Sequence, residues 1–365
     1  MQKASGRSVS DGIPALRLLH RDEGQAVALG RRAVDTSGAR RERHENTRVV
    51  RAATHLRPYC ITLLVAACLV LAVSAWAQQP LRVVTTTTDL RSLTEAVGGD
   101  RVSVTSLVPP EIDPEDFQPK PQHVARVRDA QLVVRVGADF DLWFDRLLAQ
   151  AAAAQPELQR LRRGRYAHVD ASYGIALLDI RGAQVGPADG HAHGSGNPHY
   201  WLDPKNAAII TGSILEALAR IDPAHEKIYD ANRVAFLAKL DARLPEWTAQ
   251  LDALRGRSLI AYHSTWAYFA RRFRLDFVAF IEQKPGVPPS PAHLAAVQRL
   301  MREKDVRIVV RQPHEPERDA RFLATRAGAT VVVLAGSVGA LPAAQDYFTL
   351  FDINIAALLA AQGRR

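Results

Sequence analysis

Two histidines lie in short segments whose surroundings suit a metal ion. His199 stands in NPHYWLDP, residues 197–204, a stretch bounded by prolines just before a helical pattern. His263 stands in AYHSTW, residues 261–266, at the turn from a predicted strand into a helix. Neutral imidazole binds borderline metals such as zinc well, so both positions indicate a metal site. A histidine beside aromatic residues is also commonly a hydrogen-bonded structural residue, and both interpretations stay open at this stage.

The first half of the chain alternates between short β-branched runs and longer helical patterns. This alternation is typical of parallel α/β folds. The runs that predict strands are residues 82–87, 102–107, 130–136 and 166–170, and the helical patterns cover 89–97, a short stretch from about 122, and 140–154. A loop rich in Gly, Ala and His follows at 182–197.

A long helical pattern separates this half from a second half of the same kind. It covers residues 223–254, after a shorter helix at 204–220. At about 1.5 Å per residue it would reach roughly 45 Å, which is long enough to cross two lobes. Ligands of parallel sheets gather at the carboxyl ends of the strands, which is where His263 falls. Strands are predicted at 258–262, 277–281, 307–310 and 330–334, and helices at 265–273, 291–302, 316–327 and 346–361.

Length and charge exclude some classes of protein. With 365 residues the chain can form two lobes with separate cores. Residues 1–77 hold 12 Lys and Arg against 6 Asp and Glu, so +6 of the formal net charge of +9 lies there and +3 remains for the rest. The body of the chain has no basic stripe with interleaved aromatic residues, which argues against a nucleic-acid partner.

The N-terminal region has the pattern of a secretory signal. Residues 61–75 are almost wholly apolar, follow basic residues and end in AWA at 75–77, so residues 49–77 are interpreted as a signal peptide for export to the periplasm. The run is short for a membrane span, although a retained anchor is the alternative. Lipid attachment at Cys68 is less favoured, because apolar residues continue beyond it. Residues 1–48 are interpreted as a disordered or misannotated extension.

Because Cys60 and Cys68 both precede residue 78, the mature chain would have no thiolate ligand or disulfide.

Five segments follow one another along the chain: VPP at 108–110, DPEDF at 113–117, PHYWLDP at 198–204, YHSTWAYF at 262–269 and PPSP at 288–291. In this order they resemble the zinc/manganese solute-binding proteins of metal ABC importers (solute-binding protein family nine, metal-binding cluster A-I). The resemblance implies an α/β fold with two Rossmann-like (β/α) lobes, 78–222 and 256–365. One long rigid helix, 223–255, would join them, and a metal ion would lie in the cleft between the lobes. It also implies a monomer that delivers the ion to a membrane permease. The resemblance extends from residue 81 to residue 359.

Three metal ligands follow from this resemblance. His199 and His263 match family histidines, in agreement with the positions chosen from the sequence itself. Glu115 stands where family members usually carry a histidine, and a carboxylate is a competent ligand for Zn²⁺ or Mn²⁺. Alternatively, Glu115 is a solvated acid of a loop. Two histidines favour zinc, whereas the carboxylate shifts the balance slightly toward manganese, so Zn²⁺ is expected with Mn²⁺ as the alternative.

The fourth ligand of the family is missing. Gly336, in AGSVG at 335–339, stands where manganese-type members usually have an aspartate. Water, Glu282 or His314 are weaker candidates to complete the coordination, and Asp116 is an alternative oxygen donor or a supporting residue. His191 and His193 in the glycine-rich loop are candidates for transient metal capture.

Three other functions remain as alternatives. Two histidines and a carboxylate also describe catalytic zinc sites, but the chain has no H-E-x-x-H pair, no glycine-rich phosphate loop and no G-x-S-x-G motif, so no enzyme activity is expected. A two-lobed protein that binds a siderophore or haem would need a broad apolar or arginine-lined cleft. Metal storage or adhesion without transport is the third alternative.

Overall fold

The computed structural model describes residues 79–179, 194–284 and 286–362, and residues 78–365 form one compact unit. The predictions for residues 1–48, the signal peptide 49–77 with Cys68, and the loop histidines His191 and His193 lie outside the described residues. Within the described residues, no helix combines the length and the apolar character that a membrane crossing requires.

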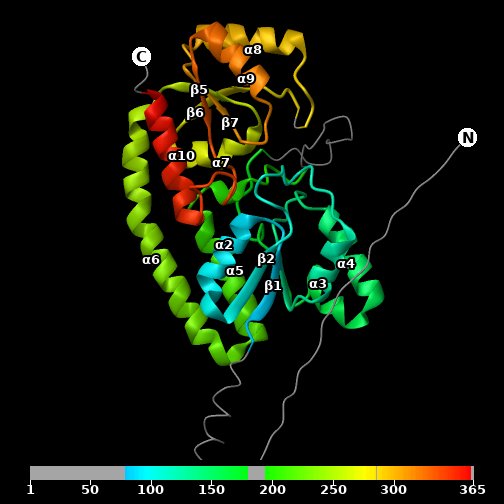
Figure 1. Ribbon diagram of the computed structural model, residues 1–365. Coiled ribbons are helices and arrows are strands. Elements are labelled where there is room, and N and C mark those ends of the chain that lie inside the picture. Colours follow the sequence, from blue (N-terminus) through cyan, green and yellow to red (C-terminus); the bar gives the residue numbers. More distant parts are fainter. Residues whose placement is uncertain (1–78, 180–193, 285, 363–365) are drawn as a thin grey trace, which may run out of the picture. The chain divides into compact units, whose positions relative to one another are not determined.

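The first half forms a parallel four-stranded sheet covered on both faces (Figure 1). Alternate residues of a strand point to opposite faces, so Val83 packs with α2 and α5, whereas Val84 packs with α3 and α4. The strand order is β2-β1-β3-β4. The strands are β1 (Leu81–Thr85), β2 (Val102–Ser106), β3 (Leu132–Arg135) and β4 (His168–Asp170), and the helices are α2 (Thr88–Gly98), α3 (Pro121–Arg128), α4 (Trp143–Ala154) and α5 (Asn206–Ile221).

The second half repeats this arrangement. Its four strands are also parallel, in the order β6-β5-β7-β8, which corresponds strand for strand to the first sheet. Ile260 and Val309 pack with α8 and α9, whereas Leu259 and Val310 belong to the core shared with α7 and α10. The strands are β5 (Ser258–Ala261), β6 (Asp276–Phe280), β7 (Ile308–Arg311) and β8 (Thr330–Val333), and the helices are α7 (Ala267–Phe273), α8 (Pro291–Glu303), α9 (Glu317–Ala327) and α10 (Tyr347–Gln362).

Helix α6 (Glu226–Leu251) connects the two halves and is flanked by short 3-10 helices at Pro223–His225 and Asp252–Leu254. It packs against α2 and α5 of the first half and against α10 of the second. Its apolar residues join one core that continues from the first sheet to the second. The predicted two-lobed α/β fold with one long joining helix is therefore confirmed, while the lobe boundaries at 222 and 255 stay predictions.

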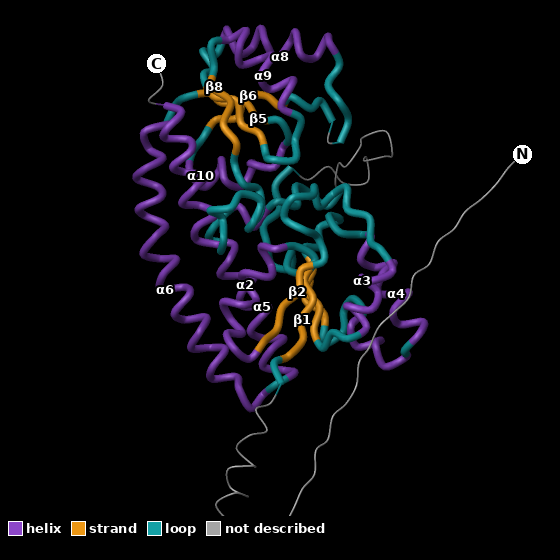
Figure 2. The backbone as a smooth tube through the Cα atoms, in the orientation of Figure 1, coloured by secondary structure: helices purple, strands orange, loops and turns teal. Residues whose placement is uncertain are grey.

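Loops lie between the two sheets, as Figure 2 shows in teal. Hydrogen bonds tie the lobes together there. The Trp201 indole N–H donates to the Gly336 carbonyl at 2.9 Å, and the Tyr347 hydroxyl donates to the Trp201 carbonyl at 2.6 Å. Buried Asp203 accepts two bonds from Arg272, at 2.6 and 2.8 Å. These contacts hold the loops of both lobes in fixed positions relative to one another.

Candidate metal centre

The side chains of Glu115, His199 and His263 converge in these loops. Glu115 Oε1 lies 3.3 Å from His199 Nε2 and 3.6 Å from His263 Nε2. An ion bound tetrahedrally at about 2.0–2.2 Å from each ligand separates its ligands by about 3.3–3.6 Å, so the observed spacing fits such an ion. In the part of the chain that the structure describes, this is the one cluster of three His, Cys, Asp or Glu residues with such spacing.

His199 is oriented by the residue two positions before it. Asn197 Oδ1 accepts hydrogen bonds from the His199 backbone N–H at 3.1 Å and from His199 Nδ1 at 3.0 Å. With its proton on Nδ1, the ring presents the lone pair of Nε2 to the cluster. Phe140 and Trp201 pack against the ring at centroid distances of 5.6 and 5.3 Å, and the residue is buried.

His263 follows β5 and is oriented by a carboxylate. Its Nδ1 lies 2.9 Å from Glu282 Oε2, and the Glu282 backbone N–H donates to the Tyr262 carbonyl. Burial lowers the pKa of His263, but hydrogen bonds and charge attraction from Glu115 and Glu282 outweigh it and leave this pKa well above its ordinary value. Glu282 thus contacts the nitrogen that faces away from the cluster, an arrangement that raises the basicity of a histidine ligand.

Glu115 is held by the turn in which it lies. Asp113 Oδ1 accepts from the Glu115 backbone N–H at 2.9 Å. The Glu115 side chain is only 5% exposed, which does not fit the alternative of a solvated loop acid. Its neighbour Asp116 is exposed and outside the cluster. His314 lines the same cavity, but its Nε2 lies 3.5 Å from Asp113 Oδ2 and it is not one of the three clustered residues.

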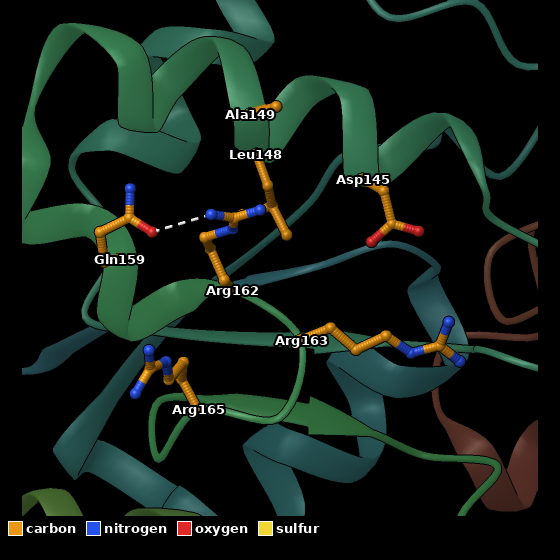
Figure 3. Close-up of a pocket in the computed structure, with 7 residues that line it drawn as sticks. All are labelled: Asp145, Leu148, Ala149, Gln159, Arg162, Arg163 and Arg165. Atoms are coloured by element: carbon orange, nitrogen blue, oxygen red, sulfur yellow. Dashed lines mark hydrogen bonds between the residues drawn. The ribbon is translucent and has the colours of Figure 1, made fainter.

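The cavity that the cluster lines has a volume of about 10 Å³, and Phe140 and Trp201 form part of its wall. This is room for about one water-sized sphere, so it suits a bare ion and is far too small for a siderophore or haem. A larger hollow of about 390 Å³ lies beside α4 (Figure 3). Arg162, Arg163 and Arg165 line it, and their guanidinium groups would repel a cation.

Several residues around the cluster were not predicted as part of a site. Asn197 belongs to the same NPHYWLDP segment as His199, but its hydrogen bond to the His199 ring depends on the folded loop. Gln312 and Gly336 also line the cavity, and Glu315 accepts hydrogen bonds from Gln312. Burial raises the pKa of Glu315 to about 7. The only sequence signal is that Gln312 directly follows β7 and that Gly336 lies shortly after β8, since ligand sites of parallel sheets form at the carboxyl ends of strands.

Comparison with known proteins places this arrangement in a family. A model of the zinc-uptake complex component A, periplasmic, matches residues 83–361. A putative metal-binding protein of Treponema pallidum is 31% identical over 255 residues, 69% of this chain and 78% of that protein. The zinc-binding protein AdcA of Streptococcus pyogenes is 22% identical over 289 residues, 77% of this chain but 56% of that longer protein.

A solved structure agrees with this result. The crystal structure of ZnuA matches with a TM-score of 0.65 and 27% identity, over 78% of this chain and 100% of that chain. The family model alone spans more than three quarters of the present sequence, including both lobes and all three clustered residues. This chain therefore belongs to the family of the periplasmic component A of zinc-uptake complexes.

Proposed function

We propose that this protein binds one zinc ion outside the cytoplasm, between Glu115, His199 and His263, and delivers it to the membrane permease of an ABC importer. The observation that carries the proposal is the spacing of the three ligand atoms, which all lie within 4.8 Å of one another around a cavity of single-ion size. Family membership supports the uptake role, and the predicted signal peptide at 49–77 supports export.

Zinc is favoured over manganese by the donor atoms. Two neutral imidazoles and one carboxylate form a borderline, nitrogen-rich set, which suits Zn²⁺ better than the oxygen-preferring Mn²⁺. Both histidines have a supporting partner on the nitrogen that faces away from the cluster, Asn197 for His199 and Glu282 for His263. Such partners fix the ring orientation, which strengthens binding.

The small size of the cavity favours metal binding over catalysis. A zinc hydrolase needs space beside the metal for water and a substrate. The cavity of about 10 Å³ has no room for a substrate in addition to an ion. We therefore propose that the ion is cargo and that the protein is not an enzyme.

The proposal is tested by competitive titration of the metal-free full chain with Zn²⁺ and Mn²⁺. We expect one tightly bound zinc per chain and weaker binding of manganese. Replacement of both His199 and His263 by alanine should abolish tight binding. His293→Ala, a change in a histidine on α8 that hydrogen-bonds to the Phe280 carbonyl, should leave it intact. Tight binding that survives in the double variant would move the site elsewhere.

A further inference from the structure

Gln312 lies directly after β7 with its side chain buried and held in one orientation. Its Nε2 donates to Thr265 Oγ1 at 2.9 Å and to Glu315 Oε1 at 3.2 Å, and its backbone N–H donates to Glu315 Oε2 at 2.6 Å. Because an amide nitrogen can only donate and both contacts lie on the Nε2 side, the carbonyl oxygen Oε1 points the other way. The amide is therefore fixed, with its acceptor atom turned away from Glu315.

That oxygen lies against Gly336. A Cβ atom at position 336 would be 1.7 Å from Gln312 Oε1 and 2.7 Å from Gln312 Cδ, far inside any allowed contact. The backbone at 336 cannot easily retreat, since its carbonyl accepts the hydrogen bond from the Trp201 indole at 2.9 Å. Gly336 does not have a positive φ, so glycine is required here by lack of space and not by backbone conformation. The two positions are therefore coupled: with Gln312 in place, only glycine fits at 336.

Both residues line the cavity around which the three ligand atoms gather. A tetrahedral ion takes a fourth donor, and side-chain amide oxygens bind divalent cations such as Ca²⁺. Two further carboxylates, Glu282 and Glu315, already lie next to the cluster through His263 and Gln312. An additional carboxylate on this side would be repelled by them, whereas the amide of Gln312 carries no charge.

We propose that Gln312 closes the fourth side of the metal site with its neutral Oε1, and that the Gln312–Gly336 pair favours zinc by keeping a second carboxylate out. This rests on the proposed function. With one carboxylate, one neutral amide oxygen and two neutral imidazoles as ligands, the complex of a divalent ion keeps a net charge of +1. A carboxylate at 336 would neutralise the ion and add a hard oxygen donor, which shifts preference toward manganese.

The first test replaces Gln312 by methionine in the full chain, since methionine has a similar length and lacks the amide oxygen. Zinc affinity should fall by about 10- to 100-fold, the range that partners of a metal site contribute. The visible absorption of the Co²⁺-loaded protein should also shift, because the donor set changes. His293→Ala is the control, because this histidine of α8 hydrogen-bonds to the Phe280 carbonyl and does not line the cavity, and its Co²⁺ spectrum should match that of the parent. An unchanged Co²⁺ spectrum in Gln312→Met would overturn the proposal even if affinity falls.

The second test exchanges the pair. Gly336→Asp alone should weaken binding of both metals, because the new side chain collides with Gln312. Combining it with Gln312→Ala should restore binding and lower the preference for Zn²⁺ over Mn²⁺ by about tenfold or more relative to Gln312→Ala alone. A combined variant that keeps the full zinc preference would refute the role of the pair. Failure of the parent protein to bind any metal would refute the proposed function. If the parent protein binds zinc tightly and the Gln312 variants bind it equally well, only this inference would be refuted.

Discussion

At the scale of single residues, His263 lies between two carboxylates that stabilise its protonated form. Glu115 is on its Nε2 side and Glu282 on its Nδ1 side, and together they keep the pKa of His263 well above the ordinary value despite burial. A metal ion can bind Nε2 only after that nitrogen has lost its proton. In the proposed metal centre, capture of the ion is therefore expected to be linked to proton release at His263.

We expect zinc binding at neutral pH to release a proton, and zinc affinity to rise with pH by up to about tenfold per unit while His263 is protonated in the metal-free protein. Titration calorimetry in buffers of different ionisation enthalpy measures the number of protons released. The Glu282→Gln variant should release less, because one of the carboxylates that raise the pKa of His263 is gone. Zinc affinity independent of pH between 6 and 8 would contradict this account.

Glu115 and its neighbour Asp116 offer a matched comparison. Glu115→Ala removes the carboxylate that lies within 3.6 Å of both histidines, so zinc affinity should fall by at least about tenfold. Asp116→Ala changes an exposed acid of the same loop and should leave affinity unchanged. Competition against a fluorescent zinc chelator measures both. Equal losses of zinc affinity in the two variants would show that the charge of the loop matters and that Glu115 does not coordinate the ion.

The residues of the site were only partly predictable. The residue types around His199 and His263 were enough to predict both as candidate ligands. Glu115 was predicted only through the family resemblance, because nothing in the sequence around it marks it as a ligand. Gln312 could not be predicted, since its proposed role depends on its proximity to Gly336, a residue 24 positions away in sequence. The orienting roles of Asn197 and Glu282 likewise depend on tertiary contacts.

At the scale of elements, the turn after β3 positions the wall of the cavity. Arg135 and Asp141, each 1% exposed, form an ion pair at 2.8 Å, and Asp141 also accepts from the backbone N–H groups of Val136 and Gly137. This turn includes Ala138 and Asp139 with positive φ and carries Phe140, which packs on His199. It also explains why α4 begins at Trp143 and not at the predicted residue 140.

Breaking this buried pair should be costly. Asp141→Ala leaves the guanidinium of Arg135 buried without its main partner, and the free energy of unfolding should fall by about 3–5 kcal/mol. Asp145 also pairs with Arg135 but is 41% exposed, so Asp145→Ala should cost less than about 1 kcal/mol. Urea unfolding measures both values. Similar losses in the two variants would show that burial does not decide the strength of the pair.

At the scale of the whole described unit, the two lobes share one core and are joined by buried polar contacts. Asp89 at the start of α2 accepts from the backbone N–H of Val338, beyond β8, at 3.0 Å. The alternation of strands and helices was enough to predict two lobes and the long helix α6. It gave no indication of these contacts, because Asp89 and Val338 are 249 residues apart.

Asp89 should make stability depend on pH. Burial raises its pKa from 3.8 to about 7, although hydrogen bonds from Val338 and Ser337 partly oppose this. Between about pH 4 and 7 the folded protein therefore keeps a proton that the unfolded chain has released, and Asp89 lowers stability as pH rises, by up to about 1.4 kcal/mol per unit. Asp89→Asn keeps an acceptor for Val338 and should flatten this decline. Urea unfolding at several pH values in this window checks it, and identical slopes for parent and variant would contradict it.

The central claim, that one zinc ion is held between Glu115, His199 and His263, is tested most directly by X-ray diffraction from zinc-loaded crystals at wavelengths on either side of the zinc absorption edge. The account predicts one dominant anomalous peak at about 2.0–2.2 Å from Glu115 Oε1, His199 Nε2 and His263 Nε2. A dominant peak elsewhere, or a site that does not include both imidazoles, would contradict it.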